Sequence, residues 1–200
     1  MEAAGRVIGD AVNEQSLKAP AHGAILKILP YSGIPVLGAL LPLIRPGRPD
    51  MLSMLCGEVL IVFGYVLTVS DIKTKRIPNG TVLAMLAVWT LIMTPQFFVD
   101  TAAALKLFID SAIGSVIGGG LFLVVYLISR KGLGGGDVKF MAVAGLYLGY
   151  GSILPAMFCG TFIAMLTGIV LILAKKLNKK DAIPLVPFLY AGILIALYFR

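Results

Sequence analysis

Charged residues are scarce in this 200-residue sequence, because they make up 14% of it against roughly a quarter in an ordinary soluble domain. So few charges cannot form the polar surface that a soluble domain presents to water. The apolar residues, 58% of the total, exclude intrinsic disorder. The composition therefore disfavours a soluble enzyme and predicts an integral membrane protein.

Metal ligands and disulfide partners are also few. The sequence has two cysteines, Cys56 and Cys159, and a single histidine, and no spacing among them is of the CxxC or Cys/His kind that binds zinc. Residues 1–18 lack the apolar core of a secretory signal peptide. We therefore expect no metal, no cofactor and no disulfide.

Long apolar runs are what the sequence has instead. A helix needs about 20 mostly apolar residues to cross a bilayer, and about 17 at the least. Six runs meet this requirement or come close to it, at residues 51–70, 81–99, 111–129, 138–152, 152–174 and 183–199. The uncharged stretch 140–174 is too long for one span, and Gly149 to Ser152 with Pro155 predict a bend within it.

A seventh run, residues 28–44, contains three prolines and is either a kinked span or a re-entrant segment. The expected fold class is therefore an all-α, polytopic transmembrane helical bundle of about seven spans, with six as the alternative. Residues 1–27 are expected to form a cytoplasmic N-terminal segment, and residues 28–200 a membrane-embedded domain.

Basic residues are distributed unevenly between the predicted loops. If the 71–79 loop is cytoplasmic, thirteen of the 17 Lys and Arg residues fall on the cytoplasmic side, and four fall outside: Arg45, Arg48, Lys106 and Arg200. Cytoplasmic loops of membrane proteins collect Lys and Arg, so this topology explains the net charge of +7. The charge does not require a nucleic-acid partner.

Two aspartates, Asp71 and Asp137, are expected near the cytoplasmic ends of their spans, where a carboxylate needs a partner or a function. Asp137 follows glycines and suits a helix cap. Asp71 ends a helix, where the helix dipole disfavours a carboxylate, and Lys73, Lys75 and Arg76 can neutralise it. Acid–base chemistry by the two carboxylates is the functional interpretation, and capping and ion pairing are the structural ones.

Two segments flank these aspartates. The run from Gly132 to Gly136 predicts either a plain turn or an open, strand-like track along which a peptide lies beside Asp137. Residues 77–79, with the sequence IPN, predict that one helix stops and the next begins, with Asn79 as its cap.

The order of these motifs resembles that of type IV prepilin peptidases, which are GxGD aspartyl proteases. Residues 134–137 (GGGD) match the GxGD signature, and Lys139 fits the longer GxGDxK pattern. Residues 71–79 are similar to the first active-site segment of the family, and residues 183–188 to its closing IPxxPF element. The resemblance implies that Asp71 and Asp137 are catalytic and that the substrate is bound by Gly134, Gly135, Gly136, Lys139, Pro78 and Asn79.

The resemblance also implies an activity and a setting. Bifunctional members carry paired CxxC motifs, and residues 1–50 contain no cysteine, so the chain resembles the short, peptidase-only members of Flp/Tad or preflagellin systems. The expected partners are the lipid bilayer and a prepilin, pseudopilin or preflagellin precursor, which is cleaved at the cytoplasmic face of the plasma membrane. The alternatives are a small ion-coupled transporter that uses Glu58 and Asp110, and a scaffold subunit.

Overall fold

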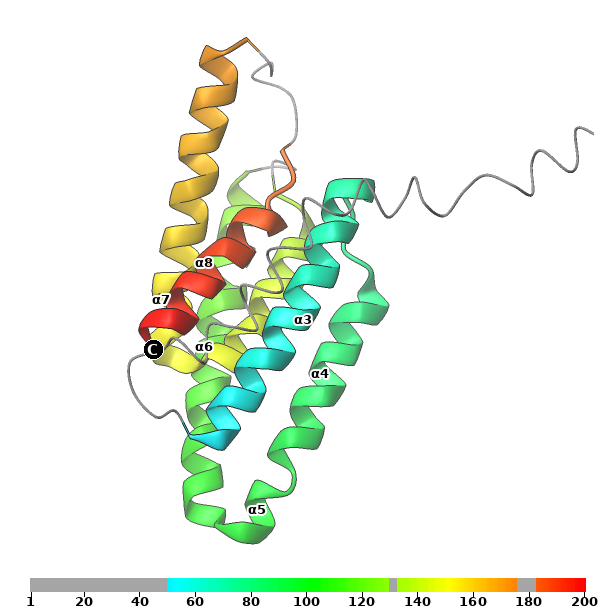
Figure 1. Cartoon of the computed structure of the whole chain (residues 1–200). Helices are drawn as coiled ribbons and strands as arrows, with labels where there is room; N and C mark the ends of the chain where they lie inside the picture. Colours follow the sequence, from blue (N-terminus) through cyan, green and yellow to red (C-terminus); the bar gives the residue numbers. More distant parts are fainter. Residues whose placement is uncertain (1–49, 130–132, 176–182) are drawn as a thin grey trace, which may run out of the picture. The chain divides into compact units, whose positions relative to one another are not determined.

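The computed structural model describes residues 50–129, 133–175 and 183–200. All of them belong to the second of two compact units of the chain, Leu37–Arg200. Every regular element in these ranges is helical, which confirms the all-α prediction: α3 (Met51–Thr74), α4 (Asn79–Met93), α5 (Gln96–Val99), α6 (Thr101–Ile128), α7 (Gly135–Leu173) and α8 (Val186–Phe199) (Figure 1). The predicted segment 1–27, the span 28–44 and the boundary between them lie outside the described residues.

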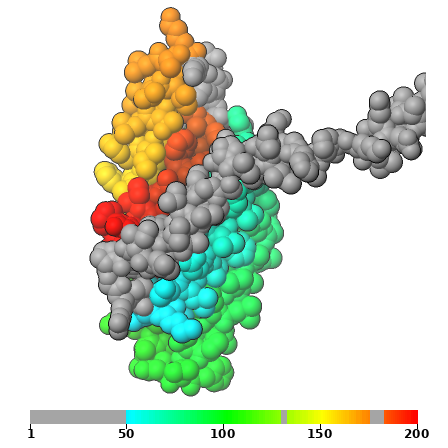
Figure 2. Space-filling model, in the orientation of Figure 1, coloured from blue at the N-terminus to red at the C-terminus, as the bar shows by residue number. Residues whose placement is uncertain are grey.

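Four stretches of the described chain are long and apolar enough to cross a membrane: α3, α4 together with α5, α6 and α7, while α8 is a shorter apolar helix. Large apolar side chains cover their outer faces, including Val62 of α3 (58% exposed) and Phe158 of α7 (70% exposed). The outer faces of α3 and of the end of α7 are visible in the space-filling view (Figure 2). The protein is therefore a membrane protein, and the count of seven spans stays a prediction.

The bend predicted in the 140–174 stretch lies at Gly149, where the backbone of α7 leaves the helical region (φ 67°, ψ −179°). Glycine adopts this positive φ without the steric cost that a side chain would add. The first half of α7 has Asp137 near its start and Tyr147 near its end. In the same way, α8 contacts Asp71 where it begins and Tyr147 where it ends. The second half of α7 packs antiparallel to α8, because Gly168 lies near Ile183 and Gly160 near Leu189. The chain therefore turns back at Gly149 (Figure 1).

This break frees backbone carbonyls at the end of the first half of α7, which need donors inside a membrane. The indole Nε1 of Trp89 donates to the carbonyl oxygen of Leu146 (3.1 Å), and Nη1 of Arg200 donates to that of Tyr147 (3.3 Å). The Tyr147 hydroxyl in turn donates to the carbonyl oxygen of Met85 (2.6 Å). The same residues that satisfy the break therefore connect α4 and α8 to α7.

Glycines lie where helices cross. Gly114 of α6 packs against the backbone of Gly145, and Gly118 against the carbonyl oxygen of Met141, with no room for a side chain at either glycine. Small residues at a crossing let helix backbones approach this closely in a membrane, so these glycines serve helix packing. The close approach holds the first half of α7, which carries Asp137, against α6.

Two helices are longer than the sequence predicted. α6 begins at Thr101 instead of residue 111, because Asp100 caps it by accepting hydrogen bonds from the amides of Ala102 and Ala103 (both 3.0 Å). α3 continues to Thr74, so Asp71 lies within its last turn. Lys75, in the left-handed conformation (φ 50°), ends α3 by donating its amide to the carbonyl oxygen of Asp71 (2.8 Å).

Candidate active site

Asp71 is buried (6% exposed) in the last turn of α3. Its Oδ2 accepts a hydrogen bond from the backbone amide of Val186 (3.1 Å), the first residue of α8. The first amides of a helix lack intrahelical partners and lie at the positive end of its dipole, so they favour a carboxylate. The α8 N-terminus therefore opposes the unfavourable field of the α3 C-terminus, and sequence reasoning had considered only the latter.

Asp137 is the third residue of α7 and is also buried (8% exposed). Its Oδ2 accepts a hydrogen bond from the amide of Gly134 (3.2 Å), the residue that precedes the helix. The sequence suggested Asp137 itself as the N-cap residue, but Gly134 occupies that position, and Asp137 at N3 makes the return bond of a capping box instead. The cap also fixes the orientation of the carboxyl group, so capping and a role in chemistry are compatible.

Both aspartates line one cavity of about 310 Å³, and their charges interact with each other. The other lining residues come from the turn after α3 and from the start of α7: Lys75, Arg76, Ile77, Asn79, Gly134, Gly135 and Gly136. Segments more than fifty positions apart in the sequence therefore meet at one end of the bundle, and we call the cavity that they line the aspartate pocket. Two buried carboxyl groups close together are suited to acid–base chemistry, because they can share one proton.

The glycine run is partly helical. Gly134 is extended (φ −77°, ψ 136°), but Gly135 and Gly136 form the first turn of α7. The prediction of a strand-like track is therefore wrong for these two residues, and Gly132 lies outside the described ones. Gly136 has another role: a Cβ there would lie 2.8 Å from Cβ of Ile77, so its missing side chain lets the α3–α4 turn lie directly against α7.

Lys139 and Asn79, both predicted to bind substrate, bind each other. The Lys139 Nζ donates to Oδ1 of Asn79 (3.0 Å), which joins the first turn of α7 to the first turn of α4. Pro78, not Asn79, occupies the N-cap position of α4, and its carbonyl oxygen accepts from the amide of Thr81 (3.1 Å). The expectation that Asn79 caps the helix is wrong, because its side chain is used between helices.

Sequence reasoning missed several contributors to the pocket. The backbone amide of Val186 is one. Val186 belongs to the IPxxPF element at residues 183–188, which is recognisable in the sequence, but the sequence does not indicate that this element contacts Asp71. Ser70 is another, because its hydroxyl donates to the carbonyl oxygen of Arg76 (3.1 Å), while that of Thr74 donates to the carbonyl oxygen of Ser70 (2.9 Å). These bonds hold the turn that carries Arg76 and Ile77 into the pocket.

Within the ranges that the structure describes, no group of three or more His, Cys, Asp or Glu side chains is placed to hold a metal ion. Cys56 and Cys159 are free thiols. The chemical groups that line the aspartate pocket are therefore two carboxyls, an amide, and the basic side chains of Lys75 and Arg76.

The fold and the pocket together define a polytopic helical membrane protein with two buried aspartates at one end of its bundle. Within this class, the chain belongs to the type IV leader peptidase family, which it matches over residues 58–173. It is 31% identical, over 151 residues, to a protein of Bacillus subtilis named prepilin leader peptidase/N-methyltransferase. That match covers 72% of this chain and 56% of the relative, so the chain spans little more than half of the relative's length. No solved structure shows significant similarity.

Proposed function

We propose that the protein is an aspartic endopeptidase that removes the leader peptide from type IV prepilin-like precursors, such as prepilins, pseudopilins or preflagellins. The observation that carries the proposal is the joint burial of Asp71 and Asp137 in one pocket of a leader peptidase family member. The activity proposed is peptide-bond hydrolysis alone, without N-methylation.

In the proposed mechanism the two carboxyl groups hold one proton between them. The ionised group takes a proton from water as the water attacks the scissile carbonyl, and the protonated group donates a hydrogen bond to the developing oxyanion. The helix dipoles of α3 and α7 alone would make Asp137 the ionised group. Because Asp71 and Asp137 each accept one backbone amide, from Val186 and Gly134, we treat them as one coupled pair.

The aspartate pocket is proposed to face the cytoplasm from the plasma membrane. Four exposed basic residues surround this end of the bundle: Lys73, Lys75, Arg76 and Lys139. Two of them, Lys75 and Arg76, line the pocket itself. Such an excess is typical of cytoplasmic ends. A precursor whose leader stays in the cytoplasm and whose apolar segment enters the bilayer would present its cleavage site at this depth.

The test is cleavage of a prepilin by membranes that contain the protein, followed as the gel shift on leader removal. Asp71→Asn and Asp137→Asn each keep the shape of the side chain but cannot exchange the proton, so each should lower the rate at least about 100-fold. The matched control is Asp100→Asn, because Asn also caps helices and Asp100 lies far from the pocket. Near-parental cleavage by either pocket variant, at equal membrane levels, would refute the aspartic mechanism.

The transporter alternative requires Glu58 and Asp110 to face one cavity. Asp110 lines a second cavity of the described chain, but Glu58 is not among the residues that line it. Glu58 instead interacts electrostatically with Tyr190 of α8. The arrangement therefore favours the peptidase over an ion path through these two residues.

A further inference from the structure

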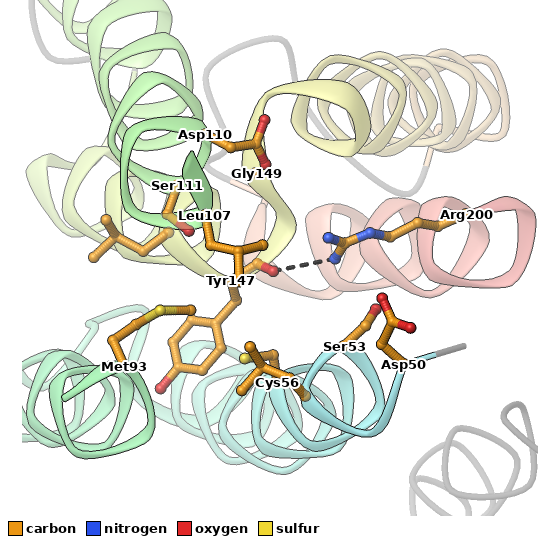
Figure 3. Close-up of a pocket in the computed structure, with 12 residues that line it drawn as sticks. Asp50, Ser53, Cys56, Met93, Leu107, Asp110, Ser111, Tyr147, Gly149 and Arg200 are labelled. Atoms are coloured by element: carbon orange, nitrogen blue, oxygen red, sulfur yellow. Dashed lines mark hydrogen bonds between the residues drawn. The ribbon is translucent and has the colours of Figure 1, made fainter. Parts of the chain in front are cut away.

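A second cavity of about 370 Å³ lies at the end of the bundle opposite the aspartate pocket, and we call it the far pocket (Figure 3). It is formed where α3 begins, α4 ends, α7 turns back and α8 ends. Its polar lining includes Asp50, Ser53, Cys56, Asp110, Ser111 and Arg200. None of these residues takes part in the proposed peptidase chemistry.

The backbone of α7 makes room for one carboxylate in this pocket. Oδ2 of Asp110 occupies the position that a Cβ on Gly149 would take, so any side chain there would displace it. Gly149 is also the residue whose positive φ turns the chain back. The break in α7 therefore creates the space into which Asp110 of α6 extends.

Two polar groups in the far pocket have no hydrogen-bond or ion-pair partner among the described residues. Ser111 is 94% buried, and its hydroxyl makes no hydrogen bond within the described ranges, although it lines the cavity. Asp110 is half-buried and forms no hydrogen bond or ion pair with any described residue. Buried polar groups are costly unless they are satisfied, so both side chains point to a bound polar ligand.

The charges of the pocket define the chemistry of that ligand. Asp110 and Asp50 are suited to a primary ammonium group, which donates charge-assisted hydrogen bonds to carboxylates. The guanidinium of Arg200, which also donates to the carbonyl oxygen of Tyr147, is suited to a phosphate. A ligand that carries both charges therefore fits better than an anion or a cation alone.

The position of the pocket identifies the source of such a ligand. It lies at the ends of apolar helices, where the hydrocarbon core gives way to lipid headgroups. Leu107 lines the pocket and is 38% exposed, so the cavity continues onto the apolar outer face of α6. We propose that the far pocket binds the phosphoethanolamine headgroup of an amine-bearing phospholipid, with the ammonium at Asp110 and the phosphate at Arg200.

The experiment is native mass spectrometry of the purified full chain in detergent, without any precursor, with one lipid added at a time. Phosphatidylethanolamine should bind better than phosphatidylglycerol, which lacks the amine, and better than phosphatidylcholine, whose ammonium cannot donate hydrogen bonds. Asp110→Asn should weaken phosphatidylethanolamine binding about tenfold, because it removes a charge-assisted bond. Asp100→Asn, which removes a carboxylate outside the pocket, should leave binding unchanged.

Asp50→Asn provides a second variant in case Asp110→Asn fails to fold, because Asp50 is exposed and makes no capping bond. It should weaken phosphatidylethanolamine binding by a smaller factor. Equal binding of the three lipids, a preference for phosphatidylglycerol, or unchanged binding by both pocket variants would overturn the proposal. Because no cleavage is measured, none of these results bears on the peptidase proposal.

Discussion

The contact between Gly136 and Ile77 predicts that one added methyl group will disable the aspartate pocket. In Gly136→Ala the new Cβ would lie 2.8 Å from Cβ of Ile77 and 3.2 Å from its Cγ1 and Cδ1. Carbon atoms pack at about 3.5–4.0 Å, so the two segments must separate by roughly 0.7–1.2 Å. Overpacking of this kind costs about 1–3 kcal/mol.

The separation matters because Ile77 and Gly136 lie on the two segments that carry the aspartates. Ile77 follows α3 and Asp71, and Gly136 directly precedes Asp137, so moving them apart changes the gap between the carboxyl groups. A displacement of about 1 Å at a catalytic centre can lower the rate about 100-fold. We therefore expect Gly136→Ala to lower kcat by about that factor in the prepilin assay, at equal membrane levels.

Gly135→Ala is the matched control, because it adds the same group one residue earlier in the same helical turn. Its Cβ would lie 3.9 Å from Cε2 of Tyr126, which is ordinary contact, and neither glycine has a positive φ. Cleavage should therefore stay near the parental rate. Ile77→Gly removes the opposing Cβ. The double variant Ile77→Gly with Gly136→Ala should therefore cleave faster than the two single-variant rate losses multiplied together would give. Equal activity of Gly136→Ala and Gly135→Ala would refute the reasoning.

Three further predictions test the contacts around the pocket and the orientation of the bundle. Asn79→Ala and Lys139→Met should each lower the cleavage rate about two- to fivefold, because each removes an exposed hydrogen bond to a charged group. Exchanging the two residues (Asn79→Lys with Lys139→Asn) should restore the rate. Failure of the exchange would favour direct substrate binding by these side chains. A cysteine at Thr74, in a cysteine-free background, should react with an impermeant reagent only from the cytoplasmic side, and labelling of intact cells would reverse the topology. Trp89→Phe leaves the carbonyl of Leu146 without its indole donor, so Tm should fall by a few degrees while cleavage persists; an unchanged Tm would show that the freed carbonyl needs no donor.

The sequence was sufficient to predict the helices, because apolar runs of bilayer length have few alternatives in a membrane. It was also sufficient to place Asp71 and Asp137 at one end of the bundle, because span alternation fixes the end at which each loop lies. It did not predict the start of α6 at Thr101, because Lys106 and Asp110 interrupt the apolar run that marked the span. A helix that extends past its apolar core depends on its cap, and Asp100 had not been considered in that role.

The role of Gly136 shows why packing within the site is harder to infer. From the sequence, the glycine run suggested conformational freedom and an approach path for substrate. The structure instead places Gly136 in an ordinary helical turn, where what matters is the missing Cβ opposite Ile77. The identity of that neighbour depends on how the α3–α4 turn packs against α7, which no local pattern records.

The environment of Asp71 shows the same dependence for charge. Counting the dipole of its own helix alone made Asp71 the unfavourable position and therefore the protonated member of the pair. The amide of Val186, 115 positions further along the chain, supplies an opposite field by placing the start of α8 against Asp71. In a site built from helix ends, each carboxylate is subject to the ends of all the helices that meet there. The protonation of the pair therefore follows from the assembly of α3, α7 and α8.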